Sequence, residues 1–314
     1  MLFDAHGDIL TDMYEQSKKG NYDSFKQRHL DAYKKGGITH SIFVNWTNPK
    51  TKNNNEFNEI FDSSFDEISR NLDIFKLCLN STDLITSITE NKIGVILGIE
   101  GLGQLESVDQ IEYLYNQGLR HASLTWNDIN KYATGLDDNN TKGISKEGAK
   151  LLKKMEKLGM IIDLAHLNQK SFDEVFDIVK GPVIISHGNT KKICSHKRNY
   201  TDEQLLKVKE RNGVLGICGI APFISSNVET QTVDEMVNHI DHAVSIMGID
   251  HVGLGLDVCY YLYDNVPDNK VEGFKHISDA GNIIIELKQR NYSDEDIEKI
   301  KYKNFFRVIK EVLG

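Results

Sequence analysis

Eight short apolar runs recur along the chain, separated by polar or amphipathic stretches. Most of the runs are rich in β-branched residues, and uninterrupted runs of this length are typical of parallel strands buried on both faces. The intervening stretches are long enough to form helices. We therefore expect strands within residues 2–8, 40–46, 93–101, 119–126, 159–166, 182–188, 213–220 and 251–257.

The stretches between the runs carry signals of helix ends. Ser145 is a suitable N-cap for a helix that Gly159 would end in a left-handed conformation. The apolar face of this helix would consist of Leu151, Leu152, Met155 and Leu158. Thr201 and Gln204 form a possible capping box for another helix, and Ser293 opens a final one.

Strand followed by helix, repeated eight times, predicts a closed α/β barrel, the (β/α)8 or TIM barrel. An open doubly wound sheet is the alternative, but no Gly-rich phosphate loop follows the first run. A barrel routinely accommodates more than about 250 residues in one domain. We therefore expect residues 1–314 to form a single barrel domain.

Composition and charge narrow the class of protein. Hydrophobic residues at 39% and charged residues at 26% are ordinary globular values, which permits a large core. A net charge of −9 argues against a nucleic-acid partner, because phosphate binding needs clustered Lys and Arg. No run approaches the roughly 20 apolar residues of a membrane span, and no signal peptide is visible. The four cysteines form no CxxC pair, so we expect reduced thiols in a cytoplasmic protein with no membrane contact.

Most of the predicted strands close with a residue that can bind a metal ion or transfer a proton. The C-terminal ends of parallel barrel strands all open onto one face, so these side chains should converge there. The residues concerned are His6, Asp8, Glu100, His166, His187 and Asp257.

Five of these six residues offer the nitrogen and oxygen donors that zinc accepts. His6 and Asp8 lie two positions apart, so in extended backbone they point to the same side and can bind one ion. Five ligands, one of them a carboxylate able to bridge, fit a two-metal centre better than a single structural zinc. In such a centre a metal-bridging hydroxide is the nucleophile and one metal polarises the scissile carbonyl. Asp257 is placed to take the proton and pass it to the leaving amine.

A lone His-x-Asp pair would be weak evidence for a metal site, but donors at four separate strand ends make coincidence a poor explanation. We expect His239 and His242 to lie on a helix surface, and the four cysteines to be core or surface thiols. We assign no role to the remaining histidines, His29, His40, His121, His196, His251 and His276.

Several segments in order resemble the membrane dipeptidase family, also called renal dipeptidase or peptidase family M19, within the amidohydrolase superfamily. They are the opening His-x-Asp, GIEG, LGMIIDLAH, PVIISHGN, HKRNYTDEQL, HVGLGLD and the closing ELKQRNYSDEDIEKIKYKNFFRVIKEV. The resemblance covers nearly the whole chain. It implies a zinc-dependent dipeptidase on a barrel of the metal-dependent hydrolase type, with small dipeptides as substrates, and it is compatible with a homodimer.

Carried over by position, the resemblance implies two zinc ions per chain. His6 and Asp8 would bind one zinc, and His166 and His187 would bind the other. Glu100 would bridge the two ions. The donor set read from the strand ends is therefore the set that the family implies.

The resemblance also implies two residues that act on the substrate. Asp257 matches the proton-transferring acid. Arg198, eleven residues after His187, matches the arginine that grips the substrate's C-terminal carboxylate. A planar bidentate donor is suited to that task. Without the resemblance, a surface ion pair would be the simpler interpretation of Arg198.

Two positions depart from the family's pattern. Where the family commonly has Leu-Thr-His, whose histidine binds substrate near the developing oxyanion, this chain has Trp126 followed by Asn127. Loss of such a donor costs roughly 3 kcal/mol at comparable sites, unless Trp126 or Asn127 binds the substrate in its place. We expect Trp126 to reshape the substrate pocket. The second departure is Cys259, where the family commonly has an acid.

Three functions are consistent with the sequence. The leading hypothesis is a metallodipeptidase. The same metal site could serve another amide or a cyclic amide, although such relatives often bridge their metals with a carboxylated lysine, and here Glu100 takes that position. A catalytically silent homologue that binds a small molecule is motivated by Trp126 and Cys259, whereas the retained Asp257 argues against it.

Overall fold

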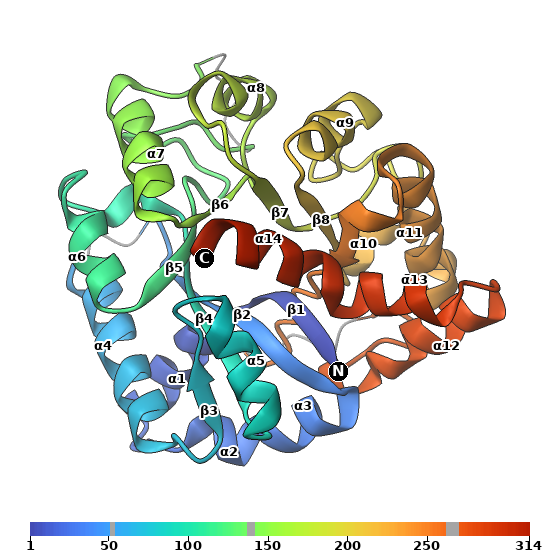
Figure 1. Ribbon diagram of the computed structural model, residues 1–314, viewed down its shortest axis with the longest axis horizontal. Coiled ribbons are helices and arrows are strands. Elements are labelled where there is room, and N and C mark those ends of the chain that lie inside the picture. Colours follow the sequence, from blue (N-terminus) through green and yellow to red (C-terminus); the bar gives the residue numbers. More distant parts are fainter. Residues whose placement is uncertain (51–53, 137–141, 262–269) are drawn as a thin grey trace.

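Nine parallel strands form one sheet that curls into a nearly closed barrel in the computed structural model, which describes residues 1–50, 54–136, 142–261 and 270–314 (Figure 1). Hydrogen-bonded neighbours follow the order β1-β2-β4-β5-β6-β7-β8-β9, and β3 pairs with β4 off this path. This order identifies a TIM barrel and excludes the open doubly wound sheet. The strands are β1 (Leu2–Gly7), β2 (Ile38–Trp46), β3 (Phe75–Leu77), β4 (Ile93–Glu100), β5 (Leu119–Ser123), β6 (Ile161–Asp163), β7 (Val183–Gly188), β8 (Val214–Ile217) and β9 (Val252–Leu254).

Each of the eight expected runs corresponds to one barrel strand, although β2 begins two residues before its run, so the predicted fold is confirmed. The short strand β3 was not expected. Its three residues are too few to show a recognisable pattern, and it pairs with β4 through Phe75↔Ile93 and Leu77↔Val95.

Helices follow the barrel strands and surround the sheet (Figure 1). None of the described helices is both long enough and apolar enough to cross a lipid bilayer. The helices are α1 (Ile9–Lys18), α2 (Ser24–Arg28), α3 (Leu30–Gly36), α4 (Asn54–Arg70), α5 (Ser81–Thr89), α6 (Gln110–Asn116), α7 (Lys146–Leu158), α8 (Gln169–Ile178), α9 (Asp202–Glu210), α10 (Ala221–Ile224), α11 (Val233–Met247), α12 (Gly281–Gln289), α13 (Asp294–Glu298) and α14 (Asn304–Leu313), with a π-helical segment at Lys299–Lys303 and 3-10 turns at Leu102–Gln104, Val228–Thr230, Ile249–His251 and Ile277–Asp279.

The helix ends expected from the sequence are confirmed. The Ser145 side chain caps α7, and Gly159 ends that helix with a left-handed φ of 72°. Thr201 and Gln204 form a reciprocal capping box at the start of α9. Ser293 caps α13, which continues through the π-helical segment into α14.

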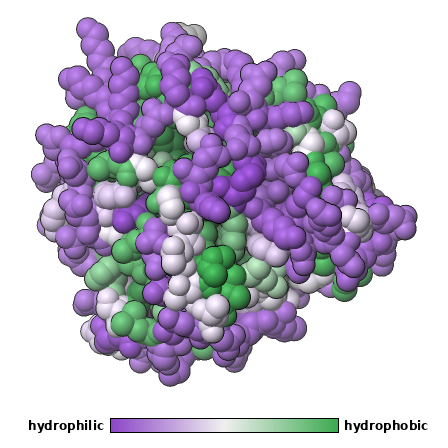
Figure 2. All heavy atoms as spheres, in the orientation of Figure 1, coloured by the Kyte–Doolittle hydropathy of each residue, from purple (hydrophilic) through white to green (hydrophobic). Residues whose placement is uncertain are grey.

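Helix α14 covers the end of the barrel at which the strands begin (Figure 1). Its Phe305 stacks on Phe3 of β1 with ring centroids 5.1 Å apart, and Val308 and Ile309 join the same buried cluster. Figure 2 views this face, which is mostly hydrophilic, with hydrophobic side chains gathered near α5. The opposite end, at which the strands finish, is where a site is expected in this fold.

The first and last strands meet at a seam that lacks a regular ladder between the described β1 and β9. The buried carboxylate of Asp4 accepts a hydrogen bond from the Leu256 amide at 2.8 Å. The Asp257 amide donates to the His6 carbonyl at 3.3 Å. The seam thereby places the N-terminal and C-terminal parts of the predicted site side by side.

Candidate metal centre and pocket

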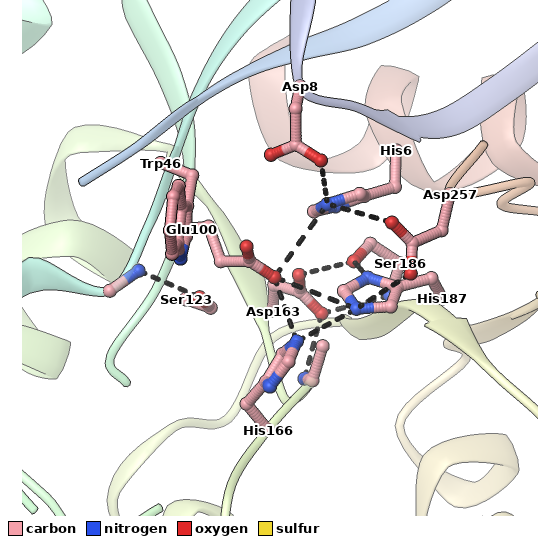
Figure 3. A network of polar contacts seen from close by, with 12 residues as sticks. His6, Asp8, Trp46, Glu100, Ser123, Asp163, His166, Ser186, His187 and Asp257 are labelled. Atoms are coloured by element: carbon pink, nitrogen blue, oxygen red, sulfur yellow. Dashed lines mark hydrogen bonds and ion pairs between the residues drawn. The ribbon is translucent and has the colours of Figure 1, made fainter. Parts of the chain in front are cut away.

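The predicted site residues converge at the end of the barrel where the strands finish. His6 lies in β1, Glu100 ends β4, His187 lies in β7 and Asp8 directly precedes α1. The ring centroids of His6 and His187 are 3.9 Å apart. The Nε2 atom of His6 is 3.7 Å from Oε1 of Glu100 and 3.9 Å from Oδ2 of Asp8. Figure 3 shows these groups directed toward one another.

One oxygen of Glu100 lies at the centre of the cluster. Its Oε1 atom is 2.8 Å from Nε2 of His166, 3.6 Å from Nε2 of His187 and 3.7 Å from Nε2 of His6. The Nε2 atoms of His166 and His187 are 2.9 Å apart. A carboxylate surrounded by three imidazoles has the position that a bridging ligand requires.

His166 and Asp257 reach the cluster from loops, which corrects the expectation that both end strands. The strands β6 and β9 finish at Asp163 and Leu254, three residues earlier in each case. His166 has a φ of 68° and Asp257 a φ of 53°, and the other three positive-φ residues other than glycine in the described chain are asparagines. Left-handed backbone is incompatible with a strand and costs energy in such residues, and it is concentrated at functional sites.

Several buried polar atoms of the cluster have no hydrogen-bond partner. They are both ring nitrogens of His6 and the Oδ1 atom of Asp8. Leaving such an atom unpaired costs about 1–3 kcal/mol. Burial lowers the pKa of His6 to about 3 and that of His187 well below its usual range, so both rings are neutral. Neutral imidazoles and unpaired carboxylate oxygens are metal ligands, so the residues fit a metal ion.

The three carboxyl groups of the cluster outnumber the nearby cation, Arg198, whose charge lowers the pKa of Glu100 and Asp257 by less than burial raises it. Burial raises the pKa of Glu100 to about 8. Burial first, and then the charge of Glu100, raise the pKa of Asp257 to about 7 and that of Asp8 well above its usual range. A cation held among these groups would stabilise their ionised forms.

A fourth carboxylate, Asp163, supports the cluster and was not predicted from the sequence. Its Oδ2 accepts a hydrogen bond from the Ser186 hydroxyl at 2.6 Å, and Ser186 Oγ lies 2.9 Å from Nδ1 of His187 (Figure 3). The same carboxylate contacts Nε2 of His121 at 3.1 Å, although no role was assigned to this histidine. The contacts from Asp163 through Ser186 to His187 fix the ring of His187 with Nε2 directed at Glu100. Asp163 could have been found because it lies inside the apolar run 159–166. An acid in a buried strand needs a partner, so it indicates a polar contact there.

Asn127 supports the other histidine of the pair. Its Oδ1 atom lies 2.8 Å from Nδ1 of His166, so the ring nitrogen donates to the amide oxygen and Nε2 faces Glu100. The sequence predicted a substrate contact for Asn127. The structure shows that Asn127 both lines the pocket and orients an imidazole.

A pocket of about 370 Å³ opens above the cluster. Its wall includes Trp46 and the predicted Trp126, whose rings meet edge to face with centroids 5.5 Å apart. Ile220 and Phe223 contribute further apolar surface. The pocket thus combines a polar floor with aromatic walls, as small-molecule sites commonly do.

Arg198 lies inside the site and is only 4% exposed. Its Nη2 atom is 2.8 Å from Nε2 of His187 and 3.0 Å from Nε2 of His166. Its buried Nη1 atom has no hydrogen-bond partner. The alternative interpretation of Arg198 as a surface ion pair is therefore wrong.

Two cysteines flank Asp257. The Sγ atom of Cys259 is 3.4 Å from Oδ1 of Asp257 and 3.4 Å from Oδ2 of Asp8. The Sγ atom of Cys218 is 3.7 Å from Oδ2 of Asp257. The sequence expectation of ordinary core or surface thiols did not foresee this contact of Cys259 with the cluster.

The expectation of a surface position is wrong for His239. This residue is fully buried on α11 and contacts Thr190 and the carbonyl of Ile224. It follows the buried stripe of the helix and takes no part in the site. His242, by contrast, is half-buried and pairs with Asp202.

A (β/α)8 barrel with buried imidazoles and carboxylates at its C-terminal end defines a barrel of the metal-dependent hydrolase type. The model of the membrane dipeptidase family, peptidase family M19, matches residues 1–313. The chain therefore belongs to this family.

Curated relatives carry dipeptidase names. The dipeptidase tcpJ of Claviceps purpurea is 29% identical over 243 residues, which cover 76% of this chain and 56% of that protein. An uncharacterised dipeptidase of Schizosaccharomyces pombe is 32% identical over 240 residues, which cover 73% of this chain and 56% of that protein. The chain thus matches only 56% of the length of either relative.

Solved structures share the fold over the full chain. A dipeptidase described as a metallopeptidase of family M19 superposes with a TM-score of 0.86 at 20% identity, covering 100% of this chain and 98% of that one. A metallopeptidase from Rhodobacter sphaeroides, liganded with a phosphinate mimic of the dipeptide L-Ala-D-Ala, gives a TM-score of 0.84 at 19% identity, with 99% of each chain covered. At these identities the likeness establishes the fold alone.

Proposed function

We propose that this chain is a zinc-dependent dipeptidase that holds two metal ions and hydrolyses the peptide bond of small dipeptides. The observation that carries the proposal is the contact of one Glu100 oxygen with three buried imidazoles, those of His6, His166 and His187. Membership of the membrane dipeptidase family supports the substrate class. The fold shared with a metallopeptidase liganded with a dipeptide mimic also supports this substrate class.

The donor set divides into two halves that share one carboxylate. His6 and Asp8 would hold one ion, and His166 and His187 would hold the other, with Glu100 between them. Bound there, zinc would supply Lewis acidity for the scissile carbonyl and lower the pKa of a water molecule.

Asp257 is the proton carrier of the proposal. Its carboxyl group faces the cluster, with Oδ1 3.9 Å from Nε2 of His6, and it also lines the pocket. A carboxyl group beside the reacting water and the leaving nitrogen can accept a proton from one and donate it to the other. Asp257 would take the proton of the attacking water and deliver it to the leaving nitrogen.

Arg198 and the aromatic wall would bind the substrate. The unpartnered Nη1 atom of Arg198 is available to donate to the C-terminal carboxylate of a dipeptide. Trp46 and Trp126 would pack against a substrate side chain and exclude water from the reacting bond.

Hydrolysis of a panel of L,L and L,D dipeptides by the purified protein tests this function. We expect cleavage that a chelator abolishes and zinc restores, with two zinc ions per chain by elemental analysis. Binding of zinc without cleavage of any dipeptide would overturn the proposal in favour of a silent homologue. Cleavage confined to cyclic amides would overturn it in favour of another amide hydrolase.

We also propose a cytoplasmic location. The four cysteines are all free in the structure, and three of them are buried. Free thiols are typical of a reducing compartment. Fractionation of the source cells would test this location.

A further inference from the structure

We propose that Cys259 is a thiolate ligand of the metal ion held by His6 and Asp8, so that this ion is bound by nitrogen, oxygen and sulfur. The inference rests on the proposed metal-dependent function and adds to it a ligand from the last strand's loop. It is carried by the contact of the Cys259 sulfur with Asp8 and by the unpaired buried atoms of His6 and Asp8.

The sulfur of Cys259 lies at ligand spacing from Asp8, with which it would share the ion. With metal–oxygen and metal–nitrogen bonds near 2.0–2.2 Å and a metal–sulfur bond near 2.3 Å, tetrahedral neighbours lie about 3.3–3.6 Å apart. The Sγ atom of Cys259 is 3.4 Å from Oδ2 of Asp8 and 3.4 Å from Oδ1 of Asp257. Nε2 of His6 is 3.9 Å from the same Asp8 oxygen, slightly more than this spacing.

Unpaired buried atoms point to a ligand at this position. His6 is 1% exposed and neither ring nitrogen has a hydrogen-bond partner. Asp8 is 5% exposed, and its Oδ1 atom also lacks one. A cation among His6, Asp8 and Cys259 would satisfy atoms that no protein group reaches.

Cys259 is also accessible to an entering ion, because it lines the pocket. On ligation the sulfur–metal bond would form as the S–H bond breaks, and the proton would leave to solvent water. No oxidant or reductant is involved. Cys218, the other thiol beside Asp257, is fully buried and contacts the opposite carboxylate oxygen, so it serves as a matched control.

Titration of the metal-free 314-residue chain with Co²⁺ tests the inference by absorption spectroscopy. Ligand-field bands in the visible region report Co²⁺ bound by any ligands, and a thiolate ligand adds a charge-transfer band in the near ultraviolet. We expect both bands in the wild-type protein. Cys259→Ser should lose the near-ultraviolet band and keep the visible bands, whereas Cys218→Ser should keep both.

The outcomes separate this inference from the proposed function. Visible bands without the near-ultraviolet band in the wild-type protein would overturn the ligand role of Cys259 and leave the metal site standing. Persistence of that band in Cys259→Ser would also overturn it. Failure of the wild-type protein to bind Co²⁺ or Zn²⁺ would overturn the proposed function and the inference together.

A second measurement does not depend on the variant folding. Iodoacetamide labelling of the wild-type protein, mapped by peptide mass spectrometry, should modify Cys259 in the metal-free form and lose most of that modification when Zn²⁺ is bound. Equal labelling in the two forms would contradict a zinc–sulfur bond. The buried Cys78 and Cys218 provide internal references in the same digest.

Discussion

The side-chain oxygen of Asn127 lies 2.8 Å from Nδ1 of His166, and this contact decides which ring nitrogen of His166 faces Glu100. Replacing Asn127 with Ala should lower zinc affinity by about 10- to 100-fold, because groups that orient a metal-binding histidine typically contribute that much. Chelator competition with the purified protein measures the change. Asn127→Asp keeps an oxygen acceptor and should retain the affinity, so equal losses in both variants would contradict an orienting role.

Asp163 should make the stability of the metal-free protein depend on pH. Burial opposes its charge, but hydrogen bonds from His121 and Ser186 outweigh burial and lower the pKa of Asp163 from 3.8 to about 2. Because the folded-state pKa is depressed, the contribution is present above about pH 4 and is lost as the pH falls from about 4 to 2. It is worth about 2 kcal/mol.

Urea unfolding of the wild-type protein and of Asp163→Asn measures this contribution. The difference in unfolding free energy between them should be largest at and above about pH 5 and should shrink toward about pH 3. The variant also loses hydrogen bonds, so a constant difference at every pH would show that the charge of Asp163 is not what stabilises the fold.

Asp257→Asn should separate proton transfer from metal binding. The amide occupies the same volume and cannot carry a proton between water and the leaving group, so kcat should fall by about 10²- to 10⁴-fold. Zinc content should be unchanged, because the five predicted ligands remain. Full activity in the variant would contradict a proton-transferring role of Asp257, and loss of zinc would show that Asp257 is a metal ligand.

Arg198→Met should weaken the processing of dipeptides that carry a free C-terminal carboxylate. A hydrogen bond to a charged group contributes about 1.5–3 kcal/mol, which corresponds to a roughly 10- to 150-fold fall in kcat/KM. Dipeptide amides offer no such carboxylate and serve as the control substrates. If both substrate types lose the same factor, Arg198 acts on the imidazoles that it contacts and not on the substrate.

Trp126→His should change the substrate profile of the pocket. Trp126 meets Trp46 across the pocket wall, and a smaller, polar ring would open space beside His166. We expect kcat/KM to rise for dipeptides with bulkier side chains relative to those with small ones. Trp46→Phe keeps an aromatic wall and is the matched control, and an unchanged ranking of dipeptides in Trp126→His would remove the idea.

The strand ends were predictable because they follow from local patterns. The apolar runs locate the barrel strands, and the acid or imidazole that closes a run locates His6, Glu100 and His187. His166 and Asp257 were found for the same reason, although their left-handed backbone shows that each stands beyond its strand. Backbone conformation of that kind is set by the surrounding loops and leaves no periodic signal.

The supporting contacts were not predictable, because they join residues far apart in the chain. Asn127 and His166 are 39 positions apart, and His121 and Asp163 are 42 apart. A sequence pattern shows which side chains can pair but not which loops meet. The error for His239 was avoidable, because the buried Met236, Ile240 and Ala243 lie on the same face of α11.

The seam between β1 and β9 closes the barrel next to the proposed metal ligands His6 and Asp8. No regular ladder joins the described β1 and β9, and among the contacts across the seam are the hydrogen bonds of Asp4 with Leu256 and of His6 with Asp257. An ion bound by His6 on one edge and Cys259 on the other would link the two edges across this gap. The rate at which the metal escapes should then report how often the two edge strands part, well before the rest of the molecule unfolds.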